Sequence, residues 1–334
     1  MSRRPAGGPG GASLLSAMRL GAIDVGSNTV RLLVADAVDS ATWRIADEDQ
    51  TITRLGEGLA RTGMLGEAPM ARTLGAVSDY VQRATRLGAG DIRIVATSAV
   101  REAKNGRAFA DAVERATGQR VDIVSGEEEA RLTVRGVRYG LGPMPGLVLT
   151  FDIGGGSTEY VLSEGETIRS MVSLRLGVVP LAEKFPFPGV VDDAGYAALL
   201  AEVRVRLAAE LPDAIRGASV AHLIGTAGTV TALAALDLGL VQYEPERVHG
   251  YVLRRGAVDR LLARLCALTV EERAALPCLE RGRADLIVPG TAIVMATYDQ
   301  IGVDQLRVSE YALREGVLVD ALEAYDGSRP GTAP

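Results

Sequence analysis

The sequence predicts an α/β protein built from two similar lobes, and three observations support this prediction. The chain has 334 residues, more than one domain usually contains. After a strand-rich start, apolar segments of strand length alternate with segments of helical periodicity. Finally, AIDVGSNTVRLLVAD (residues 22–36) and TFDIGGGSTEYVLSE (residues 150–164) share one plan. In both, an apolar strand reaches an Asp, a turn of small and hydroxyl residues follows, and a second strand returns.

The first lobe is expected to occupy residues 18–135. It begins with a hairpin around the turn DVGSN, followed by a polar third strand, WRIADEDQTITRLG. Apolar positions at helical spacing predict a helix over about residues 69–87, which Gly88 and Gly90 end. A buried strand (DIRIVAT), a helix over about residues 105–117 and another strand (RVDIVSG) complete this lobe.

The second lobe is expected to occupy residues 136–326 and to repeat the plan of the first. Its hairpin around DIGGGST leads into a polar strand, ETIRSMVSLRLG, and then into helices that reach about residue 211. A strand (HLIGTAG) and further helical segments follow, and the last helix, SEYALREGVLVDALEAY, can pack on the first lobe. Residues 1–17 and 327–334, rich in Gly, Pro and Ala, are predicted to be flexible tails.

Composition excludes several classes of protein. The net charge of −6 argues against a general nucleic-acid binder, which needs a basic surface to displace counterions from phosphates. The only histidines are His222 and His249, too few for a histidine-rich zinc site, and Cys266 and Cys278 are too far apart for a CxxC pair. No apolar run has the length of a membrane span or of a secretory signal, so we expect a cytoplasmic protein that does not bind membranes.

The two hairpin turns are the strongest functional signal. Glycine and small hydroxyl residues let several backbone N–H groups converge on one anion, and the Ser and Thr hydroxyls add donors. Aspartates cannot bind phosphate directly, so Asp24 and Asp152 are expected to hold a divalent ion or its waters. Two such turns that face each other across a cleft would bind consecutive phosphate groups.

Two helix starts add candidate groups. In SGEEEARL, helix geometry allows at most one or two of Glu127, Glu128 and Glu129 to face a cleft, and the spacing does not decide which. A carboxylate there could accept a proton from the water that attacks phosphorus. In ATSAVREAKN, Thr97 and Arg101 stand where a helix N-terminus binds anions, although capping alone would also explain the pattern.

Basic residues further along the chain give weaker signals. The turn GTAGT lacks the lysine of a Walker A loop, which excludes a P-loop NTPase. Arg281, Arg283 and Arg314 could extend a basic path for a polyanion, but each of them alone is more often a surface residue.

Taken together, these segments resemble the exopolyphosphatase and guanosine-pentaphosphate phosphatase (Ppx/GppA) family of the actin-like, sugar-kinase superfold. The resemblance covers about residues 18–318 and rests on GAIDVGSNTVRLLV, ATSAVREAKN, SGEEEARL, FDIGGGSTEYV, SLRLG, GTAGT, VHG, ADLIVPG and ALREG in that order. It implies two ribonuclease-H-like lobes with the active site in the cleft between them, and a homodimer.

The resemblance also implies roles for individual residues. The family's catalytic base falls on Glu129, and Asp152 with Glu159 suits a Mg²⁺ site, with other divalent cations or K⁺ as further candidates. Arg101 matches the family's substrate arginine, and Arg283 matches a second polyphosphate-contacting arginine more loosely. The phosphate turns fall on two groups of residues: Asp24, Gly26, Ser27 and Asn28, and Asp152, Gly154, Gly155 and Ser157.

The expected function is therefore hydrolysis of the terminal phosphoanhydride of inorganic polyphosphate. Guanosine pentaphosphate is the alternative substrate, and a kinase or an actin-like ATP-dependent switch is a less favoured interpretation. The chain ends soon after ALREG, without the extra helical domains of long family members, which favours shorter substrates.

Overall fold

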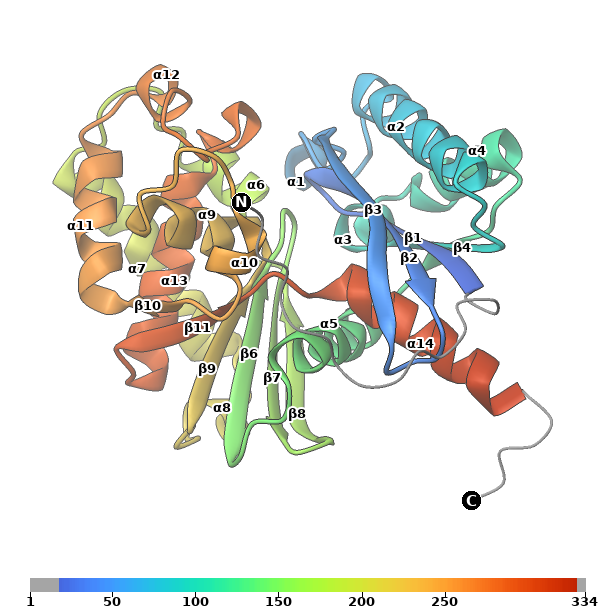
Figure 1. The fold of residues 1–334 in the computed structure, drawn as a ribbon. Helices are drawn as coiled ribbons and strands as arrows, with labels where there is room; N and C mark the ends of the chain where they lie inside the picture. The colour runs from blue at the N-terminus through green and yellow to red at the C-terminus, as the bar shows by residue number, and fades with distance from the viewer. Residues whose placement is uncertain (1–17, 329–334) are drawn as a thin grey trace, which may run out of the picture.

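The computed structural model describes residues 18–328, which form two α/β lobes joined by a pair of helices (Figure 1). The predicted tail at residues 1–17 and all but the first two residues of the predicted tail at 327–334 lie outside the described residues. The last helix continues to Ser328, two residues into the stretch predicted as the C-terminal tail. None of the helices within residues 18–328 is both long enough and apolar enough to cross a bilayer.

The first lobe is a five-stranded mixed sheet in the order β3-β2-β1-β4-β5. The hairpin β1–β2 and the neighbouring β3 are antiparallel, while β4 and β5 continue parallel to β1. The strands are β1 (Met18–Val25), β2 (Thr29–Ala37), β3 (Trp43–Ile52), β4 (Asp91–Ala96) and β5 (Val121–Ile123). The polar third strand predicted by the sequence is thus the sheet's edge, where charged side chains discourage pairing with other chains.

The helices of the first lobe follow the predicted periodicity. The helix expected near residues 69–87 is α2 (Glu67–Arg86), and the one near 105–117 is α4 (Gly106–Thr117). Both pack on one apolar face of the sheet, and two short helices, α1 (Leu59–Thr62) and α3 (Ser98–Glu102), lie near the cleft.

The second lobe is a six-stranded mixed sheet in the order β10-β11-β9-β6-β7-β8. Its strands are β6 (Leu147–Ile153), β7 (Thr158–Glu164), β8 (Thr167–Leu174), β9 (His222–Thr226), β10 (Val252–Arg254) and β11 (Gln305–Ser309). The hairpin β6–β7, the edge strand β8 and the parallel β9 repeat the arrangement of β1–β2, β3 and β4. The internal repeat in the sequence therefore corresponds to a repeated sheet topology.

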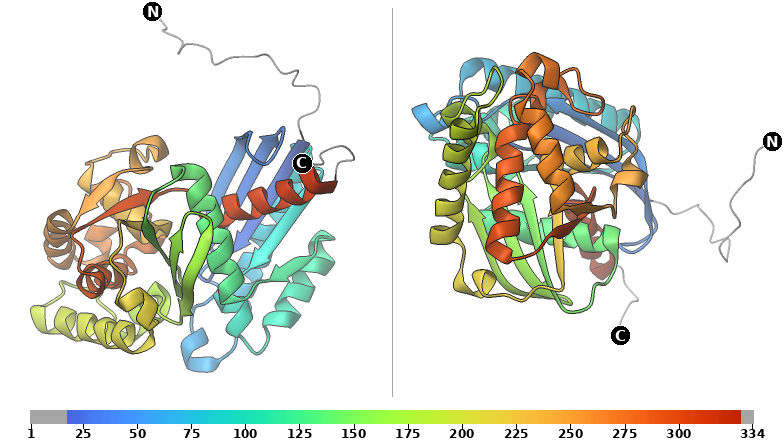
Figure 2. Two further views of the ribbon diagram at one scale, coloured as in Figure 1. Left: turned by 90° about the horizontal axis from the view of Figure 1, so that it is seen from below. Right: turned by 90° about the vertical axis from the view of Figure 1, so that its left-hand side faces the viewer.

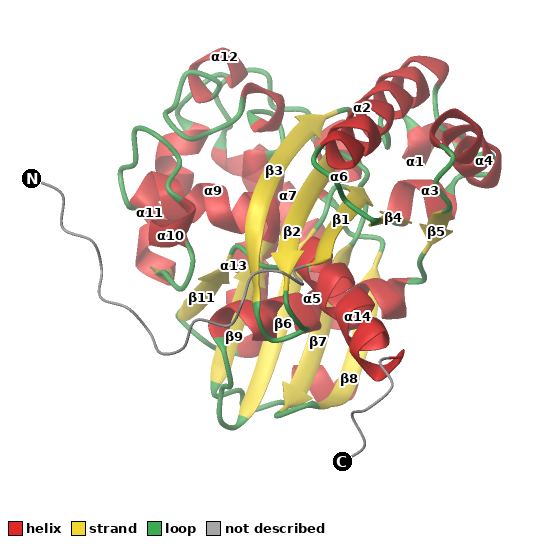
Figure 3. Ribbon diagram, turned by 45° about the vertical axis from the view of Figure 1, so that its right-hand side comes forward, coloured by secondary structure: helices red, strands yellow, loops and turns green. Residues whose placement is uncertain are grey.

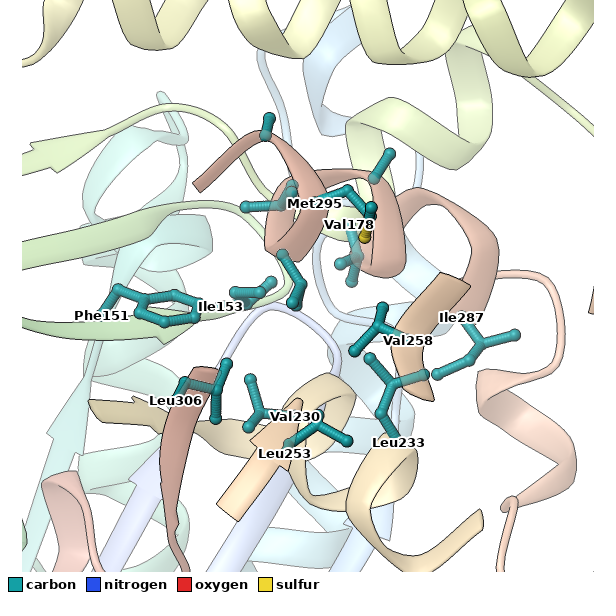
Figure 4. Packing of buried hydrophobic residues seen from close by; sticks show 14 of the residues in the cluster. Phe151, Ile153, Val178, Val230, Leu233, Leu253, Val258, Ile287, Met295 and Leu306 are labelled. Atoms are coloured by element: carbon teal, nitrogen blue, oxygen red, sulfur yellow. The ribbon is translucent and has the colours of Figure 1, made fainter. Parts of the chain in front are cut away.

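One face of the second sheet carries the largest apolar core. Phe151 and Ile153 of β6 belong to one buried cluster with Val230 and Leu233 of α9 and Ile287 of α13 (Figure 4). The helices of this lobe are α6 (Val178–Lys184), α7 (Asp193–Glu210), α8 (Asp213–Arg216), α9 (Ala227–Asp237), α10 (Pro245–Val248), α11 (Arg255–Cys266), α12 (Val270–Arg273) and α13 (Ile287–Ile301), with a 3₁₀ turn at Arg281–Arg283.

Two helices connect the lobes. The last helix, α14 (Leu313–Ser328), leaves the second lobe and lies on the free face of the first sheet (Figure 2). Beside it lies α5 (Gly126–Leu141), which packs on α14 through Leu132 and on the second sheet through Ala130 and Val134 (Figure 3). These helices therefore form one apolar layer between the two sheets.

Candidate active site between the lobes

The two hairpin turns meet where the lobes face each other. Both turns close with the same hydrogen bond: Gly26 N donates to Thr29 O at 3.1 Å, and Gly154 N donates to Ser157 O at 2.9 Å. A Cβ atom on Gly155 would lie only 2.9 Å from the backbone nitrogen of Asn28, so the turns touch through a position that only glycine can occupy. The predicted juxtaposition of the turns is therefore present.

The turns open into one cleft of about 800 Å³, which includes space continuous with solvent. Residues from both lobes line it, and they include nearly all the predicted phosphate-binding residues: Asp24, Gly26, Ser27, Asn28, Thr97, Asp152, Gly154, Gly155, Ser157 and Arg283. Ser27 Oγ is buried and has no hydrogen-bond partner among residues 18–328, so its hydroxyl is free to donate to an anion.

Asp24 and Asp152 stand at the ends of β1 and β6, each just before its turn. Burial raises the pKa of Asp24 to about 6, although Arg31 and Arg314 act against the shift. Burial raises the pKa of Asp152 to about 7, and repulsion from Glu159 adds to the effect. Asp24 Oδ1 has no hydrogen-bond partner within the described part of the chain. The cleft floor thus carries partly buried carboxylates whose charge is only partly compensated.

The structure selects Glu129 from the three adjacent glutamates. Ser125 caps α5 by accepting a hydrogen bond from Glu128 N, which fixes where the helix begins. Glu129 then points into the cleft with 9% exposure, whereas Glu127 is exposed and Glu128 pairs with Arg131. The rotation of about 100° between successive residues explains why only one of the three carboxylates reaches this position.

Arg101 supports Glu129 instead of lining the cleft. Its Nη1 donates to Glu129 Oε2 at 2.9 Å and to the carbonyl oxygen of Val124 at 2.9 Å. Burial nevertheless raises the pKa of Glu129 well above its ordinary value, and repulsion from Glu159 adds to the shift, while Arg101 opposes it. Glu129 is therefore an oriented carboxylate of increased basicity, as a general base requires.

Glu159 lies behind the cleft wall, opposite Asp152 in the β6–β7 ladder. Ser173 of β8 donates its hydroxyl to Glu159 Oε1 at 2.6 Å, and burial raises the pKa of this carboxyl group. Within residues 18–328, no three His, Cys, Asp or Glu side chains are grouped as a complete metal site. Mg²⁺ commonly uses one or two carboxylates together with water and substrate phosphate, so the partly compensated pair Asp152–Glu159 is compatible with such an ion.

The cleft also contains an arginine that the sequence reasoning missed. Arg31 lines the cleft from β2, where it is the direct cross-strand partner of Asp24. The signal was present, because a hairpin closed at Gly26–Thr29 places Arg31 opposite Asp24. Side chains of directly opposite residues project from the same face of a sheet.

The three arginines named for a basic path have different positions. Arg283 reaches the cleft because Gly228 leaves room for it: a Cβ on Gly228 would overlap the Arg283 guanidinium. Burial and the nearby charge of Arg31 lower the pKa of Arg283. Arg314 is held by the Leu32 carbonyl and by Glu315, and Arg281 is exposed, so neither lines the cleft. The predicted path is thus reduced to Arg283, joined by Arg31.

Comparison with known proteins identifies the family. The model of the Ppx/GppA phosphatase family matches residues 33–325. The chain belongs to this family. Exopolyphosphatase 2 of Mycobacterium tuberculosis is 34% identical over 316 residues, which cover 90% of this chain and 97% of the relative. Exopolyphosphatase 1 of Mycobacterium bovis is 30% identical and covers 95% of this chain and 91% of its own length.

Solved structures of Ppx/GppA proteins have the same fold. The Aquifex aeolicus family member matches with a TM-score of 0.78 at 32% identity, covering 94% of this chain and all of the matched chain. An exopolyphosphatase from Cytophaga hutchinsonii matches with a TM-score of 0.86 at 27% identity, with the same coverage. These matches confirm the two-lobed architecture of this Ppx/GppA family member.

Proposed function

We propose that this Ppx/GppA protein is an exopolyphosphatase, which hydrolyses the terminal phosphoanhydride of inorganic polyphosphate and releases orthophosphate. The names of its relatives support the proposal. The observation that carries it is a single cleft in which two glycine-rich turns, one from each lobe, meet beside the buried carboxylate of Glu129.

The terminal phosphate would lie between the two turns. The free hydroxyl of Ser27 is a donor on the first-lobe side, and the guanidinium groups of Arg31 and Arg283 face the same cleft. These groups stabilise the charge of the phosphate oxygens. Phosphoryl transfer needs mainly positioning and charge stabilisation, so a site that supplies both is suited to it.

Glu129 would orient the attacking water and accept its proton. The raised pKa makes this carboxylate a stronger base than an exposed glutamate, and the bond from Arg101 holds Oε2 in place. A general base of this kind contributes about 10²- to 10⁴-fold in rate. Ser173 has the same orienting role for Glu159.

Asp152 and Glu159 would hold Mg²⁺, with Asp24 near enough to act on Asp152 electrostatically. The support for this proposal is a group of close carboxylates: Glu159 raises the pKa of Asp152, and both raise the pKa of Glu129. When bound, the ion would offset negative charge on the substrate. Other divalent cations and K⁺ are further candidates. A homodimer is proposed on the family resemblance alone, and a cytoplasmic location is the expectation drawn above from the lengths of the apolar runs in the sequence.

Phosphate release by the purified protein tests this function. Short and long polyphosphate, guanosine pentaphosphate and ATP are compared with Mg²⁺ and with EDTA. We expect the highest kcat/KM for polyphosphate and loss of activity in EDTA. A preference for guanosine pentaphosphate would show that the same site acts on that substrate instead of polyphosphate. Hydrolysis of ATP alone, with filaments detected by light scattering, would contradict the proposal in favour of an actin-like switch.

A further inference from the structure

One side chain of the first lobe crosses the cleft to the second lobe beside the phosphate site. Arg54 forms a bidentate pair with Asp285, with Nη2–Oδ1 at 2.7 Å and Nη1–Oδ2 at 2.9 Å. Its Nη2 also donates to the carbonyl oxygen of Gly282 at 3.1 Å. The two side chains are 36% and 34% exposed, so the pair is partly accessible to solvent.

The loop that carries Arg54 is fastened to the first phosphate turn. The backbone N–H groups of Thr53 and Arg54 both donate to Asn28 O at 2.9 Å, and Gly56 N donates to Ser27 O at 2.7 Å. Arg54 adopts a left-handed backbone with φ of 51°, which is uncommon for a residue with a Cβ atom. Such a conformation persists only where the surroundings hold it, and here three backbone hydrogen bonds and the ion pair do so.

On the opposite side, Asp285 belongs to the segment that lines the second half of the cleft. It lies two residues after Arg283 and directly before Leu286, and both of these line the cleft. A further hydrogen bond, from Gln50 Nε2 to Glu280 Oε1 at 2.6 Å, joins the same two segments. The Arg54–Asp285 pair thus connects the phosphate turn of one lobe to the cleft arginine of the other.

We propose that Arg54 and Asp285 are positioning residues, and that their ion pair is an interlobe latch which sets the spacing of the two phosphate turns. This inference rests on the proposed function, because spacing matters only if both turns hold one phosphoryl group. Displacement of a reacting group by about 1 Å can lower a rate about 100-fold. A half-exposed ion pair contributes little to folding stability, so its loss acts chiefly on how the lobes meet.

The rest of the interface explains why one pair can matter. Elsewhere in the interface, Gly58 N donates to Glu183 Oε1 at 2.7 Å, and Arg175 lies 3.5 Å from Glu102. These contacts and the Gln50–Glu280 bond would remain when Arg54 releases Asp285, so the lobes would stay joined while the segments around residues 54 and 285 shift. The turns would then move apart without separation of the lobes.

The experiment compares Arg54→Gln, Asp285→Asn, their double variant, and the charge exchange Arg54→Asp with Asp285→Arg. Gln leaves the backbone strain at residue 54 largely unchanged and removes only the charge. The control is Arg93→Gln, which breaks a pair with Asp91 inside the first lobe at 2.8 Å, with side chains that are 50% and 44% exposed. Steady-state kinetics with polyphosphate and hydrogen exchange of the substrate-free protein are measured, and circular dichroism checks the fold.

We expect each single variant to lower kcat about 3- to 10-fold. A partly exposed ion pair is weak, so its loss changes the spacing of the turns by less than the displacement that costs about 100-fold. Exchange should accelerate at least about threefold in residues 50–58 and 280–286. The double variant should be no worse than either single one, because both remove the same interaction. The charge exchange should restore at least half of the lost rate, and Arg93→Gln should behave as wild type.

Two results would overturn the latch. If Arg54→Gln is impaired while Asp285→Asn is normal, Arg54 contacts substrate and does not position the lobes. If the variants change neither the hydrogen-exchange rates nor the steady-state kinetics, the pair has no positioning role. If Arg54→Gln does not fold, the results for Asp285→Asn and for the charge-exchange variant decide whether the latch exists. A wild type that hydrolyses no polyphosphate would refute the proposed function. If the wild type is active but the variants show unchanged hydrogen exchange, only the latch is refuted.

Discussion

At the scale of single residues, the proposed chemistry depends on Glu129, a carboxylate that is buried yet held by an arginine. Arg101 orients one oxygen, and the other is left for water. Replacing Glu129 with Gln keeps the shape of the side chain and removes the base. We expect kcat to fall at least about 100-fold, while the melting temperature does not fall, because burial already raises the pKa of Glu129 and disfavours its charged form. Phosphate release and thermal unfolding measure the two quantities.

The exposed neighbour Glu127 supplies the control for this prediction. Glu127→Gln alters the same helix start without touching the cleft, so its kcat should equal that of the wild type. Near-normal turnover in Glu129→Gln would remove Glu129 from the role of base.

Asp24 gives a prediction about stability and pH. Burial raises its pKa from 3.8 to about 6, so between these values the folded state binds more protons than the unfolded state. The stability that protonated Asp24 contributes relative to its ionised form is fully present below about pH 4 and is lost as pH rises to 6. Above pH 7, the ionised carboxylate lowers the free energy of unfolding by about 3 kcal/mol at most.

We therefore expect Asp24→Asn to increase the free energy of unfolding at pH 8 and to have little effect at pH 4. Urea titrations in EDTA at the two pH values measure the difference. An equal effect at both would show that the charge of Asp24 is not the cause. Asp213→Asn, which removes a carboxylate with 91% side-chain exposure, is the control.

At the scale of elements, the crossing of α5 and α14 holds the lobes in register. The helices approach so closely that a Cβ on Gly136 would overlap the Ala312 carbonyl, and one on Gly316 would overlap the Leu132 carbonyl. Backbone atoms cannot move aside as flexible side chains can. The two glycines therefore decide how near the helices lie.

We expect Gly136→Ala to lower the free energy of unfolding by about 3 kcal/mol, because overpacking forces the helices apart. Gly75→Ala, in the interior of α2, is the matched control, since nothing lies within 4 Å of its Cβ position. That variant should gain about 0.5–1 kcal/mol from the better helix propensity of alanine. Equal effects in the two variants, measured by urea denaturation, would argue against a tight crossing.

At the scale of the whole molecule, the site exists only when the two lobes face each other. A ligand that bridges the turns binds the folded state alone and stabilises it by about 2.7 kcal/mol at 100 times its Kd. We expect Mg²⁺ and phosphate together to raise the melting temperature by more than the sum of their separate effects. In Asp152→Asn, thermal unfolding should show no Mg²⁺ effect, whereas Asp213→Asn should respond as wild type does. Additive shifts would contradict a shared site.

The sequence by itself determined the features that depend on neighbours along the chain. The two hairpin turns, the helices α2 and α4 and the start of α5 follow from turn chemistry, periodicity and capping, which act over a few residues. The repeated segments that contain Asp24 and Asp152 predicted two similar lobes, because the hairpin pattern is also local in sequence. Even Arg31 could have been found from the register of its hairpin.

Only the tertiary structure decided which of these groups act together. The choice of Glu129 over its two neighbours depends on how α5 is rotated between two sheets, and the use of Arg101 as its support depends on that rotation as well. Arg54 and Asp285 are 231 positions apart and meet only because the lobes close. No local pattern encodes such contacts, since they result from packing of surfaces that are distant in sequence.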